Sequence, residues 1–411
     1  MRNSQDQESR NLDTKNEWPL KGIRVVEFCH MVMGPTCGMI LGDLGADVIK
    51  VEPLHGDTTR RLVNQGAGFF ASYNRNKRSI ALDLKSSEGL NAAKRLALGA
   101  DVVIENLRPG ALNTLGLGYE DLSAANPRLI YCALKGFLEG PYANRKALDE
   151  VVQMMGGLAY MTGPEGRPLR AGASVIDIMG GMFGVIGIQA ALASRERTGL
   201  GQEVKSALYE TTVHTVAQHM LQFAITGEPT GPMPDRPRAW AVYDTFQTKD
   251  AQSLFVGIVS DTQWKLFCQA FGREDLLTDP SLTTNNQRSE ARDRIMPIIK
   301  KLFGKMTYEA LMDTCERIGL PYAPITKPHE LYDDPHLNQS GNLLDITLPD
   351  SKVKTRVPGL PLELGGRRIE IRHDLPEIGE HGREILIEAG FSNIDINNME
   401  ISGALLKKLH K

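Results

Sequence analysis

The sequence has few cysteines, no excess of charge of one sign and no long uninterrupted apolar run. Its five cysteines, Cys29, Cys37, Cys132, Cys268 and Cys315, form no Cys-x-x-Cys pair and are odd in number, which favours reduced thiols over a disulfide framework. The formal net charge is −3 over 411 residues, so no general attraction to nucleic acid or to an anionic membrane is expected. We therefore expect a cytoplasmic protein with neither of these among its partners.

The two segments that resemble targeting or membrane sequences have other interpretations. The polar, acid-containing first residues predict a disordered tail over residues 1–18. The most apolar stretch, Ser174–Ala193, contains Asp177, Gln189 and four glycines, which is typical of a buried helix and unlike a membrane span.

Several common enzyme motifs are also missing. The turn Cys29–Pro35 after the first predicted strand lacks the glycine spacing of a dinucleotide fold. The chain has no G-x-x-x-x-G-K-S/T loop, no G-x-S-x-G elbow and no H-E-x-x-H or Cys/His cluster. The oxidoreductase, kinase, hydrolase and metalloenzyme interpretations lose their main support, and we predict neither a metal nor a tightly bound cofactor.

What is present is an alternation of short β-branched runs with helical patterns. The predicted strands are Ile23–Phe28, Ala46–Glu52, Ser79–Leu84, Asp101–Leu107 and Arg128–Leu134, and the predicted helices between and after them are Thr36–Leu44, one opened by Ser86, and Leu148–Tyr160. This order predicts an α/β fold with a parallel, doubly wound, Rossmann-like sheet, which binds ligands at the carboxyl ends of its strands.

The length and the composition predict more than one domain. We expect a large domain over 19–226, a linker over 227–240 that includes the sequence GEPTGPMPDRP, a smaller α+β domain over 241–330, and a C-terminal segment, 331–411, that returns to the large domain.

Two carboxylates stand at predicted helix starts. Asp177 lies between an apolar run and a helix in which Gly180 and Gly181 permit close approach of a backbone or a ligand, and a helix start keeps a carboxylate ionised for nucleophilic attack. Asp149 and Gln153 share one face of another helix. For each carboxylate the alternative is an ordinary helix cap.

Basic and amide residues gather in the run Tyr73–Ser79 and near later strand ends. The set comprises Arg75, Lys77, Lys85, Asn106, Arg108, Lys135 and Lys146. Together they suit a ligand with several phosphates, although each alone is typical of a solvated surface. Among nine histidines only His30, in the first turn, is of interest, and its alternative role is that of a satisfied turn residue.

Six segments in one order resemble class III CoA-transferases, the CaiB/BaiF family that includes formyl-CoA transferases. They are Leu20–Phe28, Leu41–Glu52, Asn74–Ile80 (NRNKRSI), Glu105–Leu112 (ENLRPGAL), Asn126–Tyr131 and Thr198–Gln202. The match is dense over Leu20–Ala224 and looser afterwards. It implies a Rossmann-like large domain, a small domain, an interlocked homodimer, and an acyl-CoA thioester and a carboxylate as substrates.

The resemblance also implies roles for individual residues. Asp177 matches the family's catalytic aspartate, Asp149 lies where other members have an active-site glutamate, and Lys146 matches a CoA-contacting lysine. The segments that match the CoA site are Met31, Val32 and Met33 in the first turn, Leu82 to Lys85, and Asn106, Leu107 and Arg108.

The sequence departs from the oxalate-using members at three places. Val32 stands where they have a glutamine, Pro53 where they have a CoA-contacting arginine, and the run 236–240 where they have a tetraglycine loop. Leu148 replaces the histidine of the related α-methylacyl-CoA racemases, which argues against racemisation by proton transfer. Leu134–Tyr142 and Leu169–Phe183 most resemble mesaconyl-CoA C1–C4 CoA-transferases, also called 2-methylfumaryl-CoA isomerases.

The expected reaction is therefore covalent CoA transfer between carboxylates through a mixed anhydride and an aspartyl-CoA thioester on Asp177. The acceptor is expected to be a dicarboxylate such as mesaconate, with transfer within one molecule. We expect Gly180 and Gly181 to stabilise oxyanions and Arg170 to hold a distal carboxylate. The alternatives are a succinyl-CoA- or formyl-CoA-dependent intermolecular transferase, an isomerase or racemase of the same fold, and a non-catalytic CoA-binding protein.

Overall fold

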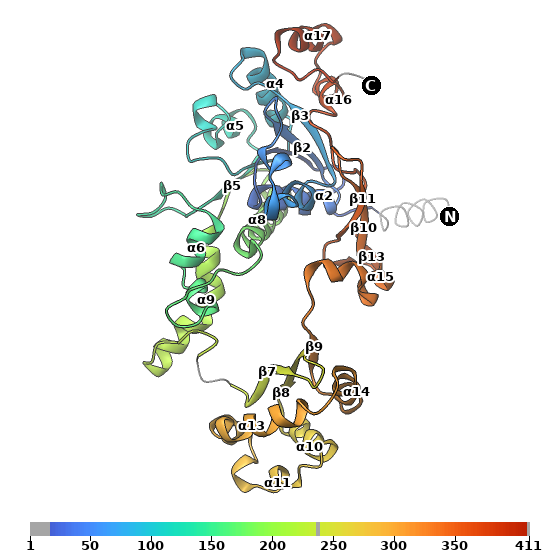
Figure 1. Cartoon of the computed structure of the whole chain (residues 1–411). Helices are drawn as coiled ribbons and strands as arrows, with labels where there is room; N and C mark the ends of the chain where they lie inside the picture. Colours follow the sequence, from blue (N-terminus) through green and yellow to red (C-terminus); the bar gives the residue numbers. More distant parts are fainter. Residues whose placement is uncertain (1–16, 236–238, 409–411) are drawn as a thin grey trace, which may run out of the picture. The chain divides into compact units, whose positions relative to one another are not determined.

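The structure is a computed structural model that describes residues 17–235 and 239–408. The predicted tail therefore lies outside the described residues, apart from Glu17 and Trp18. The chain divides into two compact units, a large unit of the described residues up to Met233 and from Asn338 onward, and a small unit, Pro234–Leu337. Both are drawn in Figure 1.

The large unit is built on a six-stranded, entirely parallel sheet. Its strands are β1 (Arg24–Phe28), β2 (Asp47–Glu52), β3 (Lys77–Ala81), β4 (Val102–Glu105), β5 (Ile130–Lys135) and β6 (Glu203–Ala207). The strand order is β3-β2-β1-β4-β5-β6, with Val26 opposite Ile49 on one side and Val103 on the other. This is the Rossmann strand order, and it confirms the predicted parallel sheet.

Helices cover both faces of this sheet (Figure 1). The helices of the large unit include α2 (Met33–Asp43), α3 (Phe69–Tyr73), α4 (Ser87–Leu98), α5 (Tyr119–Ala125), α6 (Asp149–Met155), α7 (Leu158–Thr162), α8 (Val175–Thr198), α9 (Leu208–Thr226), α16 (Gly382–Glu388) and α17 (Asn393–Ser402), of which α6 and α9 extend away from the sheet. Short 3₁₀ turns lie at η1 (Thr58–Arg61), η2 (Asn64–Gly66) and η3 (Asn113–Leu115). The single helix predicted over Leu148–Tyr160 is wrong, because Gly157 takes φ +83° and separates α6 from α7.

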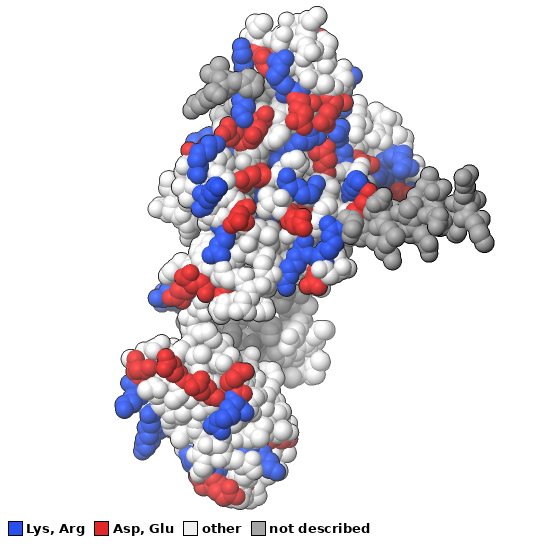
Figure 2. Space-filling view, turned by 90° about the vertical axis from the view of Figure 1, so that its right-hand side faces the viewer, with Lys and Arg blue, Asp and Glu red and all other residues white. Residues whose placement is uncertain are grey.

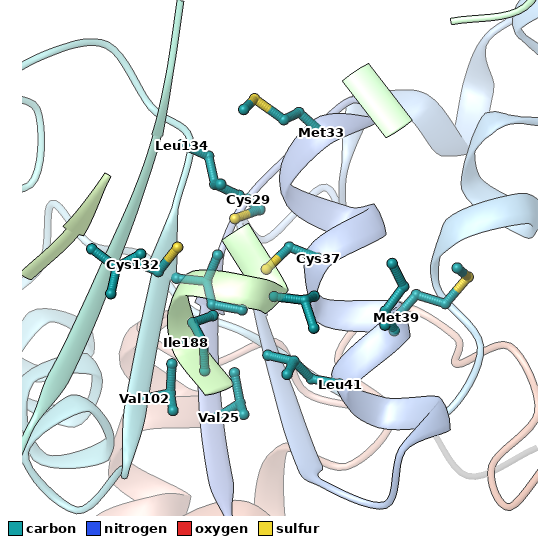
Figure 3. Packing of buried hydrophobic residues seen from close by; sticks show 14 of the residues in the cluster. Val25, Cys29, Met33, Cys37, Met39, Leu41, Val102, Cys132, Leu134 and Ile188 are labelled. Atoms are coloured by element: carbon teal, nitrogen blue, oxygen red, sulfur yellow. The ribbon is translucent and has the colours of Figure 1, made fainter. Parts of the chain in front are cut away.

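Alternate strand residues enter two separate cores. Val25 and Val102 pack with α2 and α8, whereas Val26 and Val103 pack on the other face with α4, α5 and the C-terminal helices. The sheet is buried on both faces, which explains its continuous apolar strands. Figure 3 shows the first core, with Cys37 of α2 and Cys132 of β5 projecting into the same space.

By length and composition alone, helix α8 is apolar enough to cross a membrane. Of its most apolar 18-residue stretch, 39% is buried inside the protein. The face of α8 that carries its glycines packs against neighbouring elements of the large unit. A Cβ atom at Gly184 would lie 2.8 Å from Leu134, and one at Gly187 would lie 2.5 Å from Val204. The helix therefore occupies the layer between α2 and strands β5 and β6.

The small unit has its own sheet and core. Its elements are β7 (Val242–Gln247), β8 (Ser253–Ile258), α10 (Asp261–Ala270), α11 (Glu274–Leu277), η4 (Pro280–Leu282), α12 (Asn285–Glu290), α13 (Arg292–Phe303), α14 (Tyr308–Ile318), β9 (Tyr322–Pro324), η5 (Pro328–Asp333) and α15 (Pro335–Ser340), the last of which crosses into the large unit. The antiparallel sheet β7-β8-β9 packs on Phe267 and Phe303.

The C-terminal segment adds two hairpins before α16. They pair β10 (Leu343–Thr347) with β11 (Lys354–Pro358) and β12 (Glu363–Leu364) with β13 (Arg367–Arg368). Leu405 then bridges Leu82 beyond β3, so the chain end packs on the first half of the large unit. On the face drawn in Figure 2, basic and acidic side chains are interspersed without an extended area of one sign.

Candidate active site

A cavity of about 690 Å³ opens at the carboxyl ends of β1, β2, β3 and β4. It is lined by Phe28, Cys29, His30, Val51, Glu52, Pro53, Leu54, His55, Asp57, Thr58, Leu82, Asp83, Leu84, Lys85 and Leu107. The strand order runs outward from β1 to β3 on one side and from β4 to β6 on the other, so it reverses between β1 and β4. Sheets of this kind bind ligands in the crevice at that reversal. The predicted CoA-contacting residues Leu82, Lys85 and Leu107 lie in its wall.

The loops after β1 and β4 are joined across this crevice. The His30 backbone N–H donates to Asn106 Oδ1 at 3.0 Å, and Asn106 Nδ2 donates to the His30 carbonyl at 2.8 Å. Lys135, at the end of β5, forms an ion pair with Glu105, whose carboxylate also accepts from the Leu107 N–H at 2.9 Å. Asn106 therefore fixes the loop instead of presenting its amide to a ligand.

A buried ion network anchors both ends of the first turn. Lys50 Nζ donates to the Cys29 carbonyl at 2.8 Å and lies 2.9 Å from Asp57. Lys77 Nζ donates to Glu27 at 2.8 Å and to the Pro35 carbonyl at 2.9 Å. These side chains are fully buried and paired, which makes them supports of the loop from Cys29 to Pro35.

Two predicted phosphate ligands do not reach the cavity. Lys77 is 0% exposed in the network above, and Arg75 is 2% exposed with its guanidinium 2.7 Å from Asp43. The predicted contacts of Arg75 and Lys77 with a nucleotide therefore have no counterpart in this structure. The pattern of alternating basic and amide residues belongs to the start of a buried strand, whose cations are used for internal pairing.

The first turn links the cavity to the start of α8. Met31 has φ +64°, a left-handed backbone that is rare for a residue with a side chain, while Val32 and Met33 are buried. A Cβ at Gly180 would lie 2.6 Å from Met33 Cε, and one at Gly181 would lie 2.7 Å from the Met33 carbonyl. The predicted first-turn residues thus approach the predicted nucleophile's helix directly.

This packing excludes the oxyanion role expected for Gly180 and Gly181. Both residues are buried within α8 under Met33, so the close approach that glycine permits is made by the protein's own backbone. Their N–H groups lie inside the helix and are committed to its hydrogen bonds.

Asp177 lies in the first turn of α8 and is half-buried. Within residues 17–235 and 239–408 its carboxylate makes no hydrogen bond and no ion pair, and it does not cap its own helix. Burial, and then the negative charge of Asp149, raises the pKa of Asp177 to about 7. An unpaired, accessible carboxylate of this kind suits nucleophilic attack better than capping.

Asp149, the first residue of α6, caps α8 from outside. Its Oδ2 accepts from the N–H groups of Ile176 at 2.9 Å and Asp177 at 3.1 Å, and its Oδ1 accepts from Gln153 Nε2. Gln153 Oε1 accepts from the Ala171 N–H at 2.9 Å. The predicted pair Asp149 and Gln153 therefore holds the segment that presents Asp177, and it occupies two free N–H groups of that helix.

The remaining predicted residues lie outside the buried part of the site, with Arg170 partly buried and the others exposed. Arg170 forms an ion pair with Glu150 at 2.6 Å. Lys85, Arg108 and Lys146 are exposed, and their side chains make no ion pair with any residue that the structure describes.

Sequence reasoning missed Tyr73 at the end of α3. Burial, and then the charges of Asp177 and Asp149, raises the pKa of the Tyr73 phenol, so this phenol lies within the electrostatic range of both carboxylates. No motif distinguishes this tyrosine from a core aromatic. His55, in the cavity wall, was also missed because nothing in its sequence context indicates a ligand. No cluster of three metal-binding side chains occurs among the described residues.

Comparisons with known proteins show to which family the chain belongs. The model of CoA-transferase family III matches residues 20–382. The chain belongs to CoA-transferase family III. It is 35% identical to a succinate–glutarate CoA-transferase of Agrobacterium fabrum, with 90% of this chain and 95% of that protein covered. It is 32% identical to a succinyl-CoA:mesaconate CoA-transferase of Haloarcula hispanica, with 90% and 96% covered.

A solved structure is similar over the same length. The crystal structure of a CAIB/BAIF family protein from Brucella suis superimposes with a TM-score of 0.79 at 33% identity and covers 91% of this chain and all of that one. The family predicted from six sequence segments is thus confirmed. The family III enzyme described here transfers CoA between carboxylates and uses CoA thioesters as substrates without a tightly bound cofactor.

Proposed function

We propose that Asp177 is the covalent nucleophile and that the acids exchanged are short dicarboxylic acids. One observation carries the first part: Asp177 is the half-buried, unpaired carboxylate that the first turn and Asp149 hold at the start of α8. CoA bound in the cavity would extend its thioester along the turn Cys29–Met33, which connects the cavity to the start of α8.

The reaction proceeds by exchange of acyl and thiolate groups on one carboxylate. An Asp177 oxygen attacks the donor thioester carbonyl, which forms a mixed anhydride and releases CoA thiolate. The thiolate attacks the Asp177 carbonyl carbon, which forms an aspartyl-CoA thioester and frees the donor acid. The acceptor carboxylate attacks that thioester, and the thiolate returns to the acceptor acyl group, so Asp177 is regenerated. Retained CoA acts at a high effective concentration in each step.

Hydrogen-bond donors for the oxyanions have to come from outside the α8 backbone, because Asp149 occupies the N–H groups of Ile176 and Asp177. We propose the Tyr73 hydroxyl as one donor, since the charges of both carboxylates act on it and it is only half-buried. Arg170 would turn from Glu150 to the distal carboxylate of the substrate, with Lys146 and Arg108 near the CoA phosphates.

The relatives' names support the dicarboxylate class. The Agrobacterium protein is named for succinate and glutarate, and the Haloarcula protein for succinyl-CoA and mesaconate. A formyl-CoA:oxalate CoA-transferase of Escherichia coli is 32% identical over 415 residues, but its substrates are not preferred here because of the departures at Val32 and residues 236–240. Transfer from succinyl-CoA to glutarate or mesaconate is therefore proposed ahead of transfer within one mesaconyl-CoA molecule.

Trapping of the intermediate tests the nucleophile. With succinyl-CoA and hydroxylamine, the wild-type enzyme is expected to yield an aspartyl hydroxamate in the peptide that contains Asp177. Asp177→Ala is expected to lose turnover by at least three orders of magnitude while it retains CoA-ester binding. Turnover retained by this variant would exclude Asp177 as nucleophile.

Isotope labelling distinguishes the two kinds of transfer. Mesaconyl-C1-CoA is incubated with ¹³C-labelled free mesaconate and the label in the CoA ester is measured. Intermolecular transfer incorporates the label, whereas isomerisation within one molecule converts the ester without incorporation.

We also propose a homodimer and a cytoplasmic location. Helices α6, α8 and α9, which pack on one another, leave large apolar side chains exposed, among them Met154, Met182, Ile186, Leu221 and Ile225. Exposed apolar area of this kind is usually covered by a partner, and a second copy in the interlocked arrangement is proposed to cover it. All five cysteines are free and buried, as expected of thiols in a reducing compartment.

A further inference from the structure

The wall of the cavity contains three carboxylates but only one lysine, yet its proposed ligand is an anion. Glu52, Asp57 and Asp83 all line it. An anionic ligand enters such a cavity only where these carboxylates are neutralised and where free donors remain.

The carboxylates are satisfied within the protein. Glu52 is paired with Arg60 at 2.6 Å and accepts from Ser79 Oγ at 2.6 Å. Asp57 lies 2.9 Å from Lys50 and accepts from the Thr59 N–H.

Asp83 accepts from the Lys85 backbone N–H at 3.0 Å, which turns the chain and leaves the Lys85 ammonium exposed at the cavity. The buried carboxylates of the cavity wall are therefore paired. The hydrogen-bond donors that remain free for a ligand lie on the exposed rim.

Three rim side chains have nitrogen atoms without an intramolecular partner among the described residues. They are His30, His55 and Lys85. Burial lowers the pKa of the His30 imidazole. The charge of Asp57 raises this pKa and that of Lys50 lowers it further, so His30 is the least suited of the three to bind an anion. His55, after β2, and Lys85, after β3, belong to neighbouring strands of the sheet and are both exposed.

His55 is held by its backbone while its ring stays free. Its carbonyl accepts from Arg61 Nη1 at 2.7 Å, and Gly56, which follows it, takes φ +78° against Ile378. The charged groups that line the cavity with His55 are Glu52, Asp57, Asp83 and Lys85; Glu52 and Asp57 are ion-paired, and Asp83 accepts from the Lys85 backbone N–H. The loop therefore fixes the backbone of His55, and its exposed imidazole has no hydrogen-bond partner among the described residues.

We propose that His55 donates a hydrogen bond to a phosphate of CoA, together with Lys85, and so contributes to the affinity of the enzyme for CoA esters. This inference rests on the proposed placement of CoA in the cavity. It assigns to His55 a binding role for which the sequence gives no motif, and it leaves the chemistry at Asp177 to other residues.

Calorimetric titration with CoA, 3′-dephospho-CoA and pantetheine tests the proposal. His55→Gln is expected to weaken CoA binding about tenfold or more, as the loss of a hydrogen bond to a charged group predicts, and to leave pantetheine binding unchanged. His55→Lys supplies another N–H donor at this position and is expected to recover most of the affinity. A loss for CoA but not for dephospho-CoA assigns the contact to the 3′-phosphate, and a loss for both assigns it to the diphosphate.

The charge control is Arg197→Gln, an exposed residue in the last turn of α8 that does not line the cavity, which is expected to bind all three ligands like wild type. Equal affinities of wild type and His55→Gln for CoA would overturn the proposal. An equal loss for pantetheine would also overturn it, because a phosphate contact is absent from that ligand. If wild type binds none of the ligands, the placement of CoA itself fails, which is a distinct outcome.

Discussion

At Asp177, opposing influences act on the same carboxylate. The start of α8 favours the ionised form, whereas burial and the nearby Asp149 charge favour the protonated form and raise the pKa to about 7. A nucleophile must be ionised, but a carboxylate of higher pKa is also a stronger nucleophile once it is ionised. The local geometry therefore couples catalysis to pH.

The acidic limb of the rate profile measures this coupling. We expect kcat/KM for succinyl-CoA to fall as the pH decreases through about 7, because protonated Asp177 does not attack. In Asp149→Asn the neighbouring charge is lost, so the limb is expected to move to lower pH. Initial rates between pH 5 and 9 give both curves, and coinciding limbs would show that Asp149 does not act on Asp177.

Asp149→Asn is also expected to slow turnover at pH 8 by about ten- to a hundredfold, less than the loss in Asp177→Ala. The amide keeps one oxygen for the two N–H groups of Ile176 and Asp177, but its NH2 group cannot accept from Gln153 Nε2. The pair that holds the segment of the nucleophile is therefore broken, and the nucleophile is held less firmly. Asp121→Asn, an exposed acid in the first turn of α5, is the control and should keep the wild-type rate. A wild-type rate in Asp149→Asn would reduce this residue to a structural cap.

Stability should depend on Asp177 in the opposite sense to activity. The folded state keeps a proton on this carboxyl between the ordinary value of 3.8 and about 7, so its contribution to stability is lost as the pH rises through that window. Asp177→Asn is therefore expected to be more stable than wild type at pH 8, by at most about 4 kcal/mol, and equally stable at pH 4. Urea denaturation at both pH values checks this sign.

At the scale of elements, helix α8 joins packing with function. Its glycines remove side chains from the face that meets α2, β5 and β6, so its N-terminal turn lies directly on Met33. The N–H groups of Gly180 and Gly181, which the sequence suggested for oxyanion binding, are buried inside this helix under Met33. Helix α6 contributes through Asp149, which binds the end of α8 from a neighbouring element.

Gly181→Ala tests that contact. The added Cβ would lie 2.7 Å from the Met33 carbonyl, which is backbone and cannot rotate away. Despite the higher helix propensity of alanine, we expect a net loss of about 1–3 kcal/mol in the free energy of unfolding and weaker binding of CoA esters. The control is Gly99→Ala after α4, where the nearest atom is 3.5 Å away and stability should change little. Unchanged unfolding of Gly181→Ala would show that the turn has room to move.

At the scale of the whole molecule, the exposed apolar side chains of α6, α8 and α9 require an explanation that one chain does not provide. Met182 and Ile186 are 48% and 59% exposed on a helix whose opposite face is fully packed. A second copy of the chain would bury them beside the site, so the site would depend on the assembly.

Sedimentation equilibrium is expected to give twice the 45.3 kDa mass of the chain. The double variant Met182→Glu and Ile186→Glu should shift the mass toward the monomer or prevent soluble expression, while Ile401→Glu, 84% exposed on α17, should remain dimeric. A monomeric wild type would contradict the proposed homodimer.

The sequence by itself predicted the parallel sheet, the family and the position of Asp177 at a helix start. These follow from local patterns: β-branched runs repeat at each strand, glycines mark the close face of α8, and the family segments are contiguous. Helix α8 and strands β1 to β5 consequently lie within a few residues of their predicted bounds.

Only the tertiary structure decided which charged residues are free. Arg75 and Lys77 resemble ligand cations in the sequence, but buried Asp43 and Glu27 from distant positions take their charges. Gly180 and Gly181 resemble an oxyanion site until Met33 lies on them, and Tyr73 joins the site only because α3 brings it there. Pairing and burial depend on contacts between residues far apart in the chain, so no local pattern specifies them.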